Sequence, residues 1–476
     1  MQWRYIAYAG SAVRRQEEND SCGLFERTWN RAAYCLGIGD LDLAEPNQRE
    51  IILDILDEIL EQGGYTHLVL SAALMKYQYL DKQQRAFITR VSEGTVERLI
   101  QLDYVIDSFV KKPKVRKMKP LIRTVLRFST YQILYMDGVP DSAICNEAVK
   151  LVKKRGLGGL SGFVNGILRN ISRSKKDISY EGLSVKYSMP QWIIDYWQEQ
   201  FDGDTVEEVL EALLAEKKTC IRVNTDLISM EALKESLESQ GIVVEPVQIV
   251  IDGQSQTMDR AYYISGYDYL MAIDEFADGK FYVQDVSSMM IGFISQVKEN
   301  SNVIDVCAAP GGKSLHVAEL MSGTGHVQAR DVSDYKVELM EENIAKSGLN
   351  NIDAIVWDGT VLDESAVETA DLVICDAPCS GLGVIAGKPD IKYHMSMEQL
   401  RQLSELQRQI LYNASKYVKH GGRIIYSTCT IGRIENQGNV KWFLENNTEF
   451  KLISESQILP KKGEQDGFFF ALMERA

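Results

Sequence analysis

The chain has 476 residues, 45% of them hydrophobic and 25% charged, and its formal net charge at pH 7 is −15. This length predicts two or three domains, and the composition is typical of a water-soluble globular protein. No apolar run approaches the roughly 18 residues that span a bilayer, and the start lacks a signal peptide's apolar core, so we expect a cytoplasmic protein without membrane contact. The acidic net charge argues against a globally basic nucleic-acid binder, which leaves local basic segments to be examined.

The eight cysteines are too sparse for a disulfide framework, and no CxxC or Cys/His cluster indicates zinc. We therefore expect mostly reduced thiols and no metal site. Residues 1–45 show no clear periodicity and are expected to be an N-terminal extension of unassigned role.

Residues 46–174 have apolar side chains at three- and four-residue spacing, which predicts an all-helical domain. Helical stretches are expected at residues 52–64, 67–80, 85–110, 121–136, 142–155 and 161–173. Within this domain, residues 111–123 (KKPKVRKMKPLIR) hold seven Lys or Arg and no acid. The segment is either a solvated loop between helices or a phosphate-binding patch, and residues 150–155 add further positive charge.

Residues 175–280 change in character and predict a small α+β segment that links two larger domains. From residue 281 to residue 476, short apolar runs alternate with helical patterns. That alternation predicts a doubly wound α/β sheet with helices on both faces.

The stretch VIDVCAAPGGKSLHVAEL predicts a strand that turns through a glycine loop into a helix near Lys313. Gly311 and Gly312 permit close backbone approach, and a helix start offers free N–H groups. Asp331 ends the next strand, where an acid can accept hydrogen bonds from ribose hydroxyls, unless it only caps a helix. Asp358 ends a third strand, where it would lie near an adenine amino group or be an ordinary loop acid. The crevice fits an adenosine-bearing ligand.

Two cysteines follow two later strands, Cys379 in DAPCSGLG and Cys429 in YSTCT. Ligands of such sheets bind beyond the carboxyl ends of the strands, so both sulfurs are expected to face one crevice. Taken singly, each cysteine would more often be a buried core residue than a catalytic one.

Four motifs carry a resemblance to a known family: CAAPGGKS, DAPCSGLG followed by KPDIKY, YSTCT followed by EN, and QDVSS at 284–288. Together they resemble the RNA 5-methylcytosine methyltransferases of the RsmB/Nop2/Sun family. The helical region, especially SGFVNGILRN, resembles the NusB-like RNA-binding domain that precedes the catalytic domain in RsmB-type members. The resemblance covers residues 46–476 and implies a Rossmann-like methyltransferase domain that uses S-adenosyl-L-methionine.

The resemblance also implies residue roles. Cys429 would be the nucleophile, Cys379 would assist release of the product, and Asp376 would bind or protonate the cytosine ring at N3. Lys313 would lie near the reacting centre, unless it is merely a cation at a helix start. The implied cofactor contacts are Cys307, Ala308, Ala309, Pro310, Gly311, Gly312, Lys313, Asp331, Asp358 and Asp376.

Chemistry supports these roles, because C5 of cytosine is too poor a nucleophile until a thiolate adds at C6. The implied substrate is a cytosine of small-subunit (16S) ribosomal RNA, and a monomer is expected. Two departures from the family pattern occur: Arg433 stands where the family's Pro-x-Glu-Asn has proline, and Met189 precedes Pro190 where the family often has histidine. The alternatives are a noncatalytic RNA-binding protein and a DNA cytosine methyltransferase, although no Pro-Cys-Gln motif of the latter is present.

Overall fold

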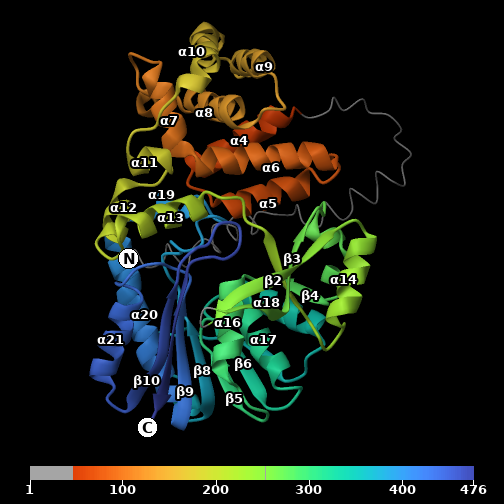
Figure 1. Ribbon diagram of the computed structural model, residues 1–476, viewed down its shortest axis with the longest axis vertical. Coiled ribbons are helices and arrows are strands. Elements are labelled where there is room, and N and C mark those ends of the chain that lie inside the picture. The colour runs from red at the N-terminus through yellow and green to blue at the C-terminus, as the bar shows by residue number, and fades with distance from the viewer. Residues whose placement is uncertain (1–46, 252–253) are drawn as a thin grey trace.

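The computed structural model describes residues 47–251 and 254–476. Figure 1 shows a helical domain at one end of the molecule, a small sheet to one side, and a larger sheet covered by helices at the other end. The expected N-terminal extension, residues 1–45, lies outside the described residues. Within the described part of the chain, no helix combines the length and apolar character needed to cross a bilayer.

The first domain is entirely helical, as the apolar spacing predicted. Its helices are α4 (Gln48–Leu60), α5 (Thr66–Lys76), α6 (Lys82–Glu97), α7 (Leu99–Ser108), α8 (Pro120–Tyr135), α9 (Asp141–Lys154) and α10 (Ser161–Ser174). Buried Ile, Leu and Val side chains from these helices form one continuous core. The predicted stretch 85–110 is two helices, because the backbone leaves helical geometry at Arg98, where φ is −102° and ψ is 18°.

Three short helices connect this domain to the rest: α11 (Gly182–Lys186), α12 (Gln191–Gln198) and α13 (Gly203–Leu213). Buried residues of α12 and α13 share a core with Leu382, Ile385 and Ile431, which lie in the loops after the two motif cysteines. The linking helices therefore support the candidate site directly.

The small sheet is antiparallel with strand order β2-β3-β1-β4. Its elements are β1 (Thr219–Val223), α14 (Met230–Ser239), β2 (Val243–Ile251), β3 (Gln254–Ser265), α15 (Asp274–Ala277) and β4 (Phe281–Val283). The fourth strand thus lies just beyond residue 280, where the linking segment was expected to end.

The large sheet has seven strands in the order β10-β11-β9-β8-β5-β6-β7. The strands are β5 (Asn302–Asp305), β6 (His326–Asp331), β7 (Ile352–Val356), β8 (Ala370–Asp376), β9 (Val418–Thr428), β10 (Phe450–Ile458) and β11 (Phe468–Arg475). Strands β5 to β9 pair in parallel, and β11 is antiparallel to both β9 and β10. The order reverses between β5 and β8, which places a ligand crevice beyond their carboxyl ends.

Helices cover both faces of this sheet, so the doubly wound prediction is confirmed. The helices are α16 (Val286–Ser295), α17 (Gly312–Leu320), α18 (Asp334–Ser347), α20 (Met397–Tyr417) and α21 (Gln437–Asn446), while the short α19 (Ile391–His394) packs with the linking helices instead. One core contains buried residues of α16, α17 and α18, and the other contains buried residues of α20 and α21. Near-continuous apolar strands such as β8 follow from burial on both faces.

A fully buried ion pair joins the small sheet to the large one. Arg222 of β1 pairs with Glu319 of α17, and both side chains are 0% exposed. The Arg222 Nε also donates to Oε1 of Gln284 at 2.7 Å. Burial raises the pKa of Glu319 to about 7, while Arg222 opposes that shift. The two sheets are therefore held together by charges that have no access to water.

Candidate active site

The glycine loop predicted between β5 and α17 is present. Gly311 has φ of 99°, a left-handed conformation that glycine adopts without strain, and it precedes the first residue of α17. The buried Asp305 fixes this turn by accepting a hydrogen bond from Ser314 Oγ at 2.6 Å and one from the Cys307 N–H at 3.4 Å. Burial raises the pKa of Asp305 to about 7. Residues Cys307 to Lys313 thus form an ordered turn at the carboxyl end of strand β5.

The two predicted cofactor acids differ in their surroundings. Asp331 is 5% exposed, and its carboxylate accepts from the Ala309 N–H at 3.3 Å and pairs with Lys336 at 3.1 Å. It does not cap α18 through its side chain, since Ser333 holds the cap position. Asp358 is exposed, and Oδ1 accepts from the Thr360 N–H and hydroxyl at 2.8 and 2.7 Å. Asp331 therefore belongs to the glycine loop, whereas the recorded side-chain bonds of Asp358 stay within its own turn.

Lys313 and Asp376 meet at the centre of the crevice. The Lys313 Nζ lies 2.6 Å from Oδ2 of Asp376, and Oδ1 of the same carboxylate accepts from Ser427 Oγ at 2.7 Å. Burial by itself lowers the pKa of Lys313, but Asp376, with smaller effects of Cys429 and Asp305, raises it overall. The ammonium group stays charged between β8 and β9.

The two motif cysteines are brought together, as their positions after β8 and β9 predicted. The sulfurs of Cys379 and Cys429 are 3.2 Å apart, and both residues are partly exposed. Parallel pairing of β8 with β9 places Asp376 opposite Ser427, so both chains leave the sheet at the same edge. Cys379 and Cys429 are 50 residues apart in the sequence, but this strand pairing places their thiols side by side.

The surroundings of the two sulfurs are electrostatically unequal. The hydrogen bond from Cys379 lowers the pKa of Cys429, and the positive charges of Lys313 and Lys388 act in the same direction. The same hydrogen bond raises the pKa of Cys379 well above its usual range, with burial and the charge of Glu435 adding to the shift. Cys429 is therefore the better thiolate and Cys379 the better proton holder.

Two further residues, to which sequence analysis assigned no role, organise the cysteine loops. Buried Glu435 accepts from the Ser380 N–H at 2.8 Å and from Ser380 Oγ at 2.5 Å, so it joins the Cys429 loop to the Cys379 loop. Buried Asn436 accepts from Thr428 Oγ1 at 2.6 Å and donates to the Thr430 carbonyl at 3.2 Å. The EN pair after YSTCT marked these two residues in the sequence, but their hydrogen-bond partners can be identified only once the loops are folded.

Helix α12 supports the Cys429 loop from outside. Trp197 Nε1 donates to the Ile431 carbonyl at 3.0 Å. At Gly432, where φ is 147°, an added Cβ would lie 2.4 Å from Oη of Tyr196, so only glycine fits. The Arg433 N–H donates to Gln200 Oε1 at 2.7 Å. A proline at position 433 has no N–H for this bond, so the departure from the family pattern is used structurally.

The QDVSS motif lies beside the glycine loop and contacts neither sulfur. Gln284 is the residue closest to a Cβ built on Gly312, at 3.8 Å, and it also accepts from Arg222. Asp285 caps α16 by accepting from the Ser287 N–H at 2.9 Å and pairs with Lys217 at 2.7 Å. The motif therefore connects the small sheet to the cofactor loop.

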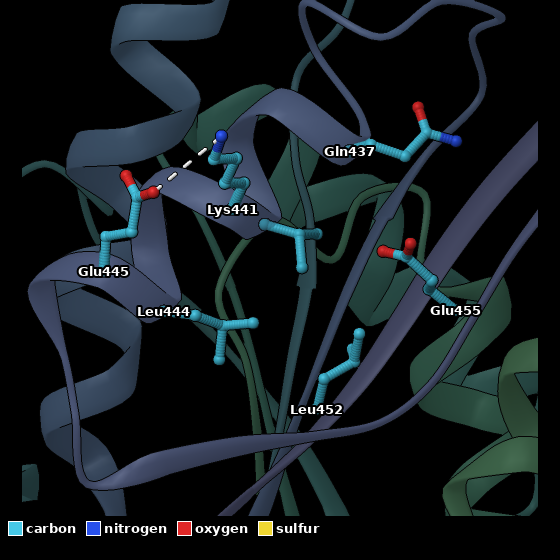
Figure 2. Close-up of a pocket in the computed structure, with 7 residues that line it drawn as sticks. Gln437, Lys441, Leu444, Glu445, Leu452 and Glu455 are labelled. Carbon is cyan, nitrogen blue, oxygen red and sulfur yellow. Dashed lines mark ion pairs between the residues drawn. The ribbon is translucent and has the colours of Figure 1, made fainter.

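A separate hollow of about 500 Å³ lies between α21 and β10 (Figure 2). It is lined by Gln437, Val440, Lys441, Leu444, Glu445, Leu452 and Glu455, and none of these is a predicted site residue. Among residues 47–251 and 254–476, no group of three or more His, Cys, Asp or Glu side chains is arranged to hold a metal ion.

Comparison with known proteins identifies the family. The NusB family model matches residues 46–173, a ferredoxin-like domain model of RsmF/B-like methyltransferases matches residues 189–254, and the model "16S rRNA methyltransferase RsmB/F" matches residues 293–474. The Bacillus subtilis protein named "Probable ribosomal RNA small subunit methyltransferase B" is 33% identical over 90% of this chain and 98% of its own length. The chain belongs to the RsmB/F family of 16S rRNA methyltransferases.

A further relative and two solved structures match most or part of the chain. The ribosomal RNA small subunit methyltransferase B of Proteus mirabilis is 27% identical over 90% of this chain and 99% of its own. The crystal structure of PH0851 matches with a TM-score of 0.75 and 26% identity, covering 90% of this chain and 98% of that one. NSun6 from Pyrococcus horikoshii, solved with the S-adenosylmethionine analogue SFG, shares the fold over 60% of this chain and 98% of its own, with a TM-score of 0.52 and 24% identity.

The fold and cofactor predictions are confirmed by this membership: a NusB-like helical domain precedes a Rossmann-like methyltransferase domain, and S-adenosylmethionine is the methyl donor. The residues of the RsmB/F site fit that ligand. Gly311 and Gly312 keep the loop free of side chains at a helix start, and the buried carboxylate of Asp331 has lone pairs for ribose hydroxyls.

We expect Asp331→Ala to weaken S-adenosylmethionine binding by about 1–3 kcal/mol, because hydroxyls of the ligand would lose a buried acceptor. Isothermal titration calorimetry on the folded protein measures this change. Asp353→Ala, which removes an exposed acid of the neighbouring strand β7, is the matched control and should bind normally. Unchanged affinity in folded Asp331→Ala would exclude Asp331 from the cofactor site.

Proposed function

We propose that this RsmB/F methyltransferase forms 5-methylcytosine in small-subunit ribosomal RNA through a covalent bond between Cys429 and C6 of the target cytosine. The observation that carries the proposal is the thiol pair: two sulfurs 3.2 Å apart at the ends of adjacent strands, with unequal proton affinities. S-adenosylmethionine supplies the methyl group as an electrophile when it is bound.

Cys429 begins the reaction in this proposal. Its thiolate adds to C6, which moves electron density to C5 and makes that carbon able to accept the methyl group. Lys313 and Lys388 favour the thiolate form, as their effect on the Cys429 pKa indicates. The covalent step is needed because the aromatic ring leaves C5 unreactive.

Asp376 is proposed to hold the cytosine at N3 during this addition, because a proton there stabilises the charge that the thiolate pushes into the ring. Its two oxygens are engaged by Lys313 and Ser427 in the structure. Opening of the ion pair with Lys313 would free one of these oxygens for the base, so Lys313 is proposed to influence how Asp376 binds it.

Cys379 is proposed to complete the cycle. After methyl transfer, C5 carries both a methyl group and its original hydrogen, and that proton must leave before Cys429 can be expelled. Once Cys429 is bonded to C6, the hydrogen bond that raised the pKa of Cys379 is gone, and the partly exposed Cys379 can give its own proton to solvent. Its thiolate then takes the C5 proton, the C–H electron pair re-forms the C5–C6 double bond, and Cys429 leaves as a thiolate. The Cys379 sulfur lies within hydrogen-bonding distance of the Cys429 sulfur, so it would face the same cytosine ring. One sulfur to attack and a second to assist release explain why two cysteines occupy this edge of the sheet.

The helical domain is proposed to hold the RNA, and the target base must be unpaired or flipped out to enter the crevice. Lys111, Lys112 and Arg116 are exposed, and no acid in the described part of the chain pairs with them. Lys114 instead donates to the carbonyls of Asp107 and Val110, at 2.7 and 3.2 Å. Lys117 and Lys119 are likewise exposed and have no acid partner among the described residues, so the segment offers several cations for phosphate contact.

Replacing Lys111, Lys112 and Arg116 with glutamine should weaken RNA binding and reduce its salt dependence. Each lost phosphate contact lowers the slope of log K against log salt by about 0.7 on single strands, so the expected reduction is about 2. Filter binding at several salt concentrations measures it. Glutamine at Lys298, Lys441 and Lys451, exposed on the other domains, is the charge-matched control, and an equal loss there or an unchanged slope would favour a solvated loop.

The proposed product is tested by mapping 5-methylcytosine in small-subunit ribosomal RNA from cells with and without this protein. The expected result is a cytosine whose methylation disappears with the protein and returns with the wild-type chain. Labelled RNA and DNA of the same sequence, incubated side by side with the purified protein, distinguish the alternatives. Methylation of DNA alone would contradict the proposal, as would RNA binding without methylation of any sequence that contains the mapped site.

A further inference from the structure

The segment after Cys379 contacts the helical domain through buried, oppositely charged side chains. Asp390 is 1% exposed, and its Oδ2 accepts a hydrogen bond from the Thr66 N–H at 3.3 Å. Thr66 is the first residue of α5, and the preceding Tyr65 provides no side-chain cap. A helix start has free N–H groups and a partial positive charge, so the Asp390 carboxylate, which comes from another domain, caps α5.

Lys392 makes the complementary contact at a helix end. It is 1% exposed, and its Nζ donates to the carbonyl of Glu97, the last residue of α6, at 2.8 Å. The carbonyls at a helix end lack partners and carry partial negative charge. Burial lowers the pKa of Lys392 to about 7, which shows how completely this ammonium is removed from water.

Ile391, between these two residues, touches the Cys379 loop. A Cβ built on Gly381 would lie 3.0 Å from Cδ1 of Ile391, and Gly381 has φ of 69°. Gly381 lies only two residues after Cys379. Contact therefore runs from two helix ends of the NusB-like domain, through Asp390, Ile391 and Lys392, to the backbone that carries Cys379.

The Cys429 loop has separate support. Tyr196 Oη accepts from the Ile434 N–H at 3.1 Å, and Trp197 donates to the Ile431 carbonyl, both from helix α12 of the linking region. Loosening the contacts of Asp390 and Lys392 leaves these bonds in place. Glu435 joins the two loops, so Cys379 depends on that link as well, but the recorded contacts of residues 390–392 reach only the loop that carries Cys379.

We infer that Asp390, Ile391 and Lys392, here named the domain bridge, position Cys379 for product release and make that step depend on the NusB-like domain. The inference rests on the proposed function, because it assigns release to Cys379. None of the three residues touches a sulfur in the structure, so they are positioning residues. Weakening the domain bridge should slow release while leaving the attack by Cys429 intact.

The test uses the full-length chain with Asp390→Ala, Lys392→Met and the conservative Asp390→Asn, which keeps an acceptor for Thr66. Single-turnover methyl transfer, steady-state turnover and the fraction of protein attached to RNA on a denaturing gel are measured for each. We expect near-normal single-turnover transfer, turnover reduced roughly 10- to 100-fold, and a raised attached fraction for Asp390→Ala and Lys392→Met. Asp390→Asn should retain most of the turnover.

Lys419→Met is the control, since it breaks an ion pair with Asp371 at the opposite end of β8 and β9, and it should turn over normally. Thermal melts and cofactor binding identify the variants that fold, and Ile391→Ala replaces any that does not. Folded variants with wild-type turnover and attached fraction would overturn the inference, and so would variants whose single-turnover transfer falls in parallel with turnover. A wild type that forms neither attached RNA nor 5-methylcytosine rejects the proposed function itself, and the inference with it.

Discussion

Replacing Cys429 with alanine should abolish both methylated product and the covalent protein–RNA adduct. No other sulfur is expected to take its place: Cys379 lies on the same edge, but burial and the charges of Glu435 and Asp376 still raise the pKa of its thiol when the hydrogen bond to Cys429 is absent. Loss of a nucleophile removes the reaction path rather than one contact, so we expect a fall of roughly a thousandfold or more in the rate of methyl transfer. Transfer of a labelled methyl group to ribosomal RNA measures it.

Cys145→Ala is the matched control for the Cys429 experiment, because it removes a buried thiol from the helical domain, far from the thiol pair in the fold. That variant should keep near-normal activity. Cofactor binding by Cys429→Ala should also be retained, which separates loss of chemistry from loss of fold. A Cys429→Ala protein that still forms an adduct, now through Cys379, would reverse the assignment of the two sulfurs.

Replacing Cys379 with alanine should instead trap the enzyme on its substrate. Cys429 can still attack and the methyl group can still transfer, but nothing then removes the C5 proton, so Cys429 cannot leave. The RNA should remain attached and appear as a slow-migrating band on a denaturing gel. The band should require S-adenosylmethionine, and turnover beyond the first cycle should be lost almost entirely.

The double variant of Cys379 and Cys429 provides the control, since its band should be absent if attachment runs through Cys429. Mass spectrometry of the digested band should find methylated cytosine on the Cys429 peptide. Normal turnover by Cys379→Ala would show that another group removes the proton. Failure of the wild type to form product or adduct on a validated RNA would exclude the covalent mechanism altogether.

Much of this architecture follows from local patterns. Apolar spacing predicts the helices of the first domain, and short buried runs ending in Asp331 and Asp376 predict strand ends at a crevice. The thiol pair needed one step more, the pairing of β8 with β9, which depends on strand order in the whole sheet. The general rules for parallel sheets predict that both cysteines lie at the same edge, but they do not predict the distance between the two sulfurs.

Other features could not be predicted because their partners are backbone atoms or lie far away in sequence. Asp390 and Lys392 bond to main-chain groups that are 324 and 295 residues away, and a backbone N–H or carbonyl leaves no signature in a sequence. The role of Glu435 could not be predicted for the same reason, because it depends on a hydrogen bond to Ser380, which lies 55 residues away in the sequence. The break at Arg98 was also missed, because apolar spacing continues across it.

The buried ion pair of Arg222 and Glu319 constrains how the two sheets can change in evolution. A substitution that removed one of these side chains would leave the other charge buried without its partner, at a cost of about 3–5 kcal/mol. That is a large share of the stability of an ordinary domain. Arg222 and Glu319 are therefore expected to change together in evolution, which favours inheritance of the two sheets as a single unit.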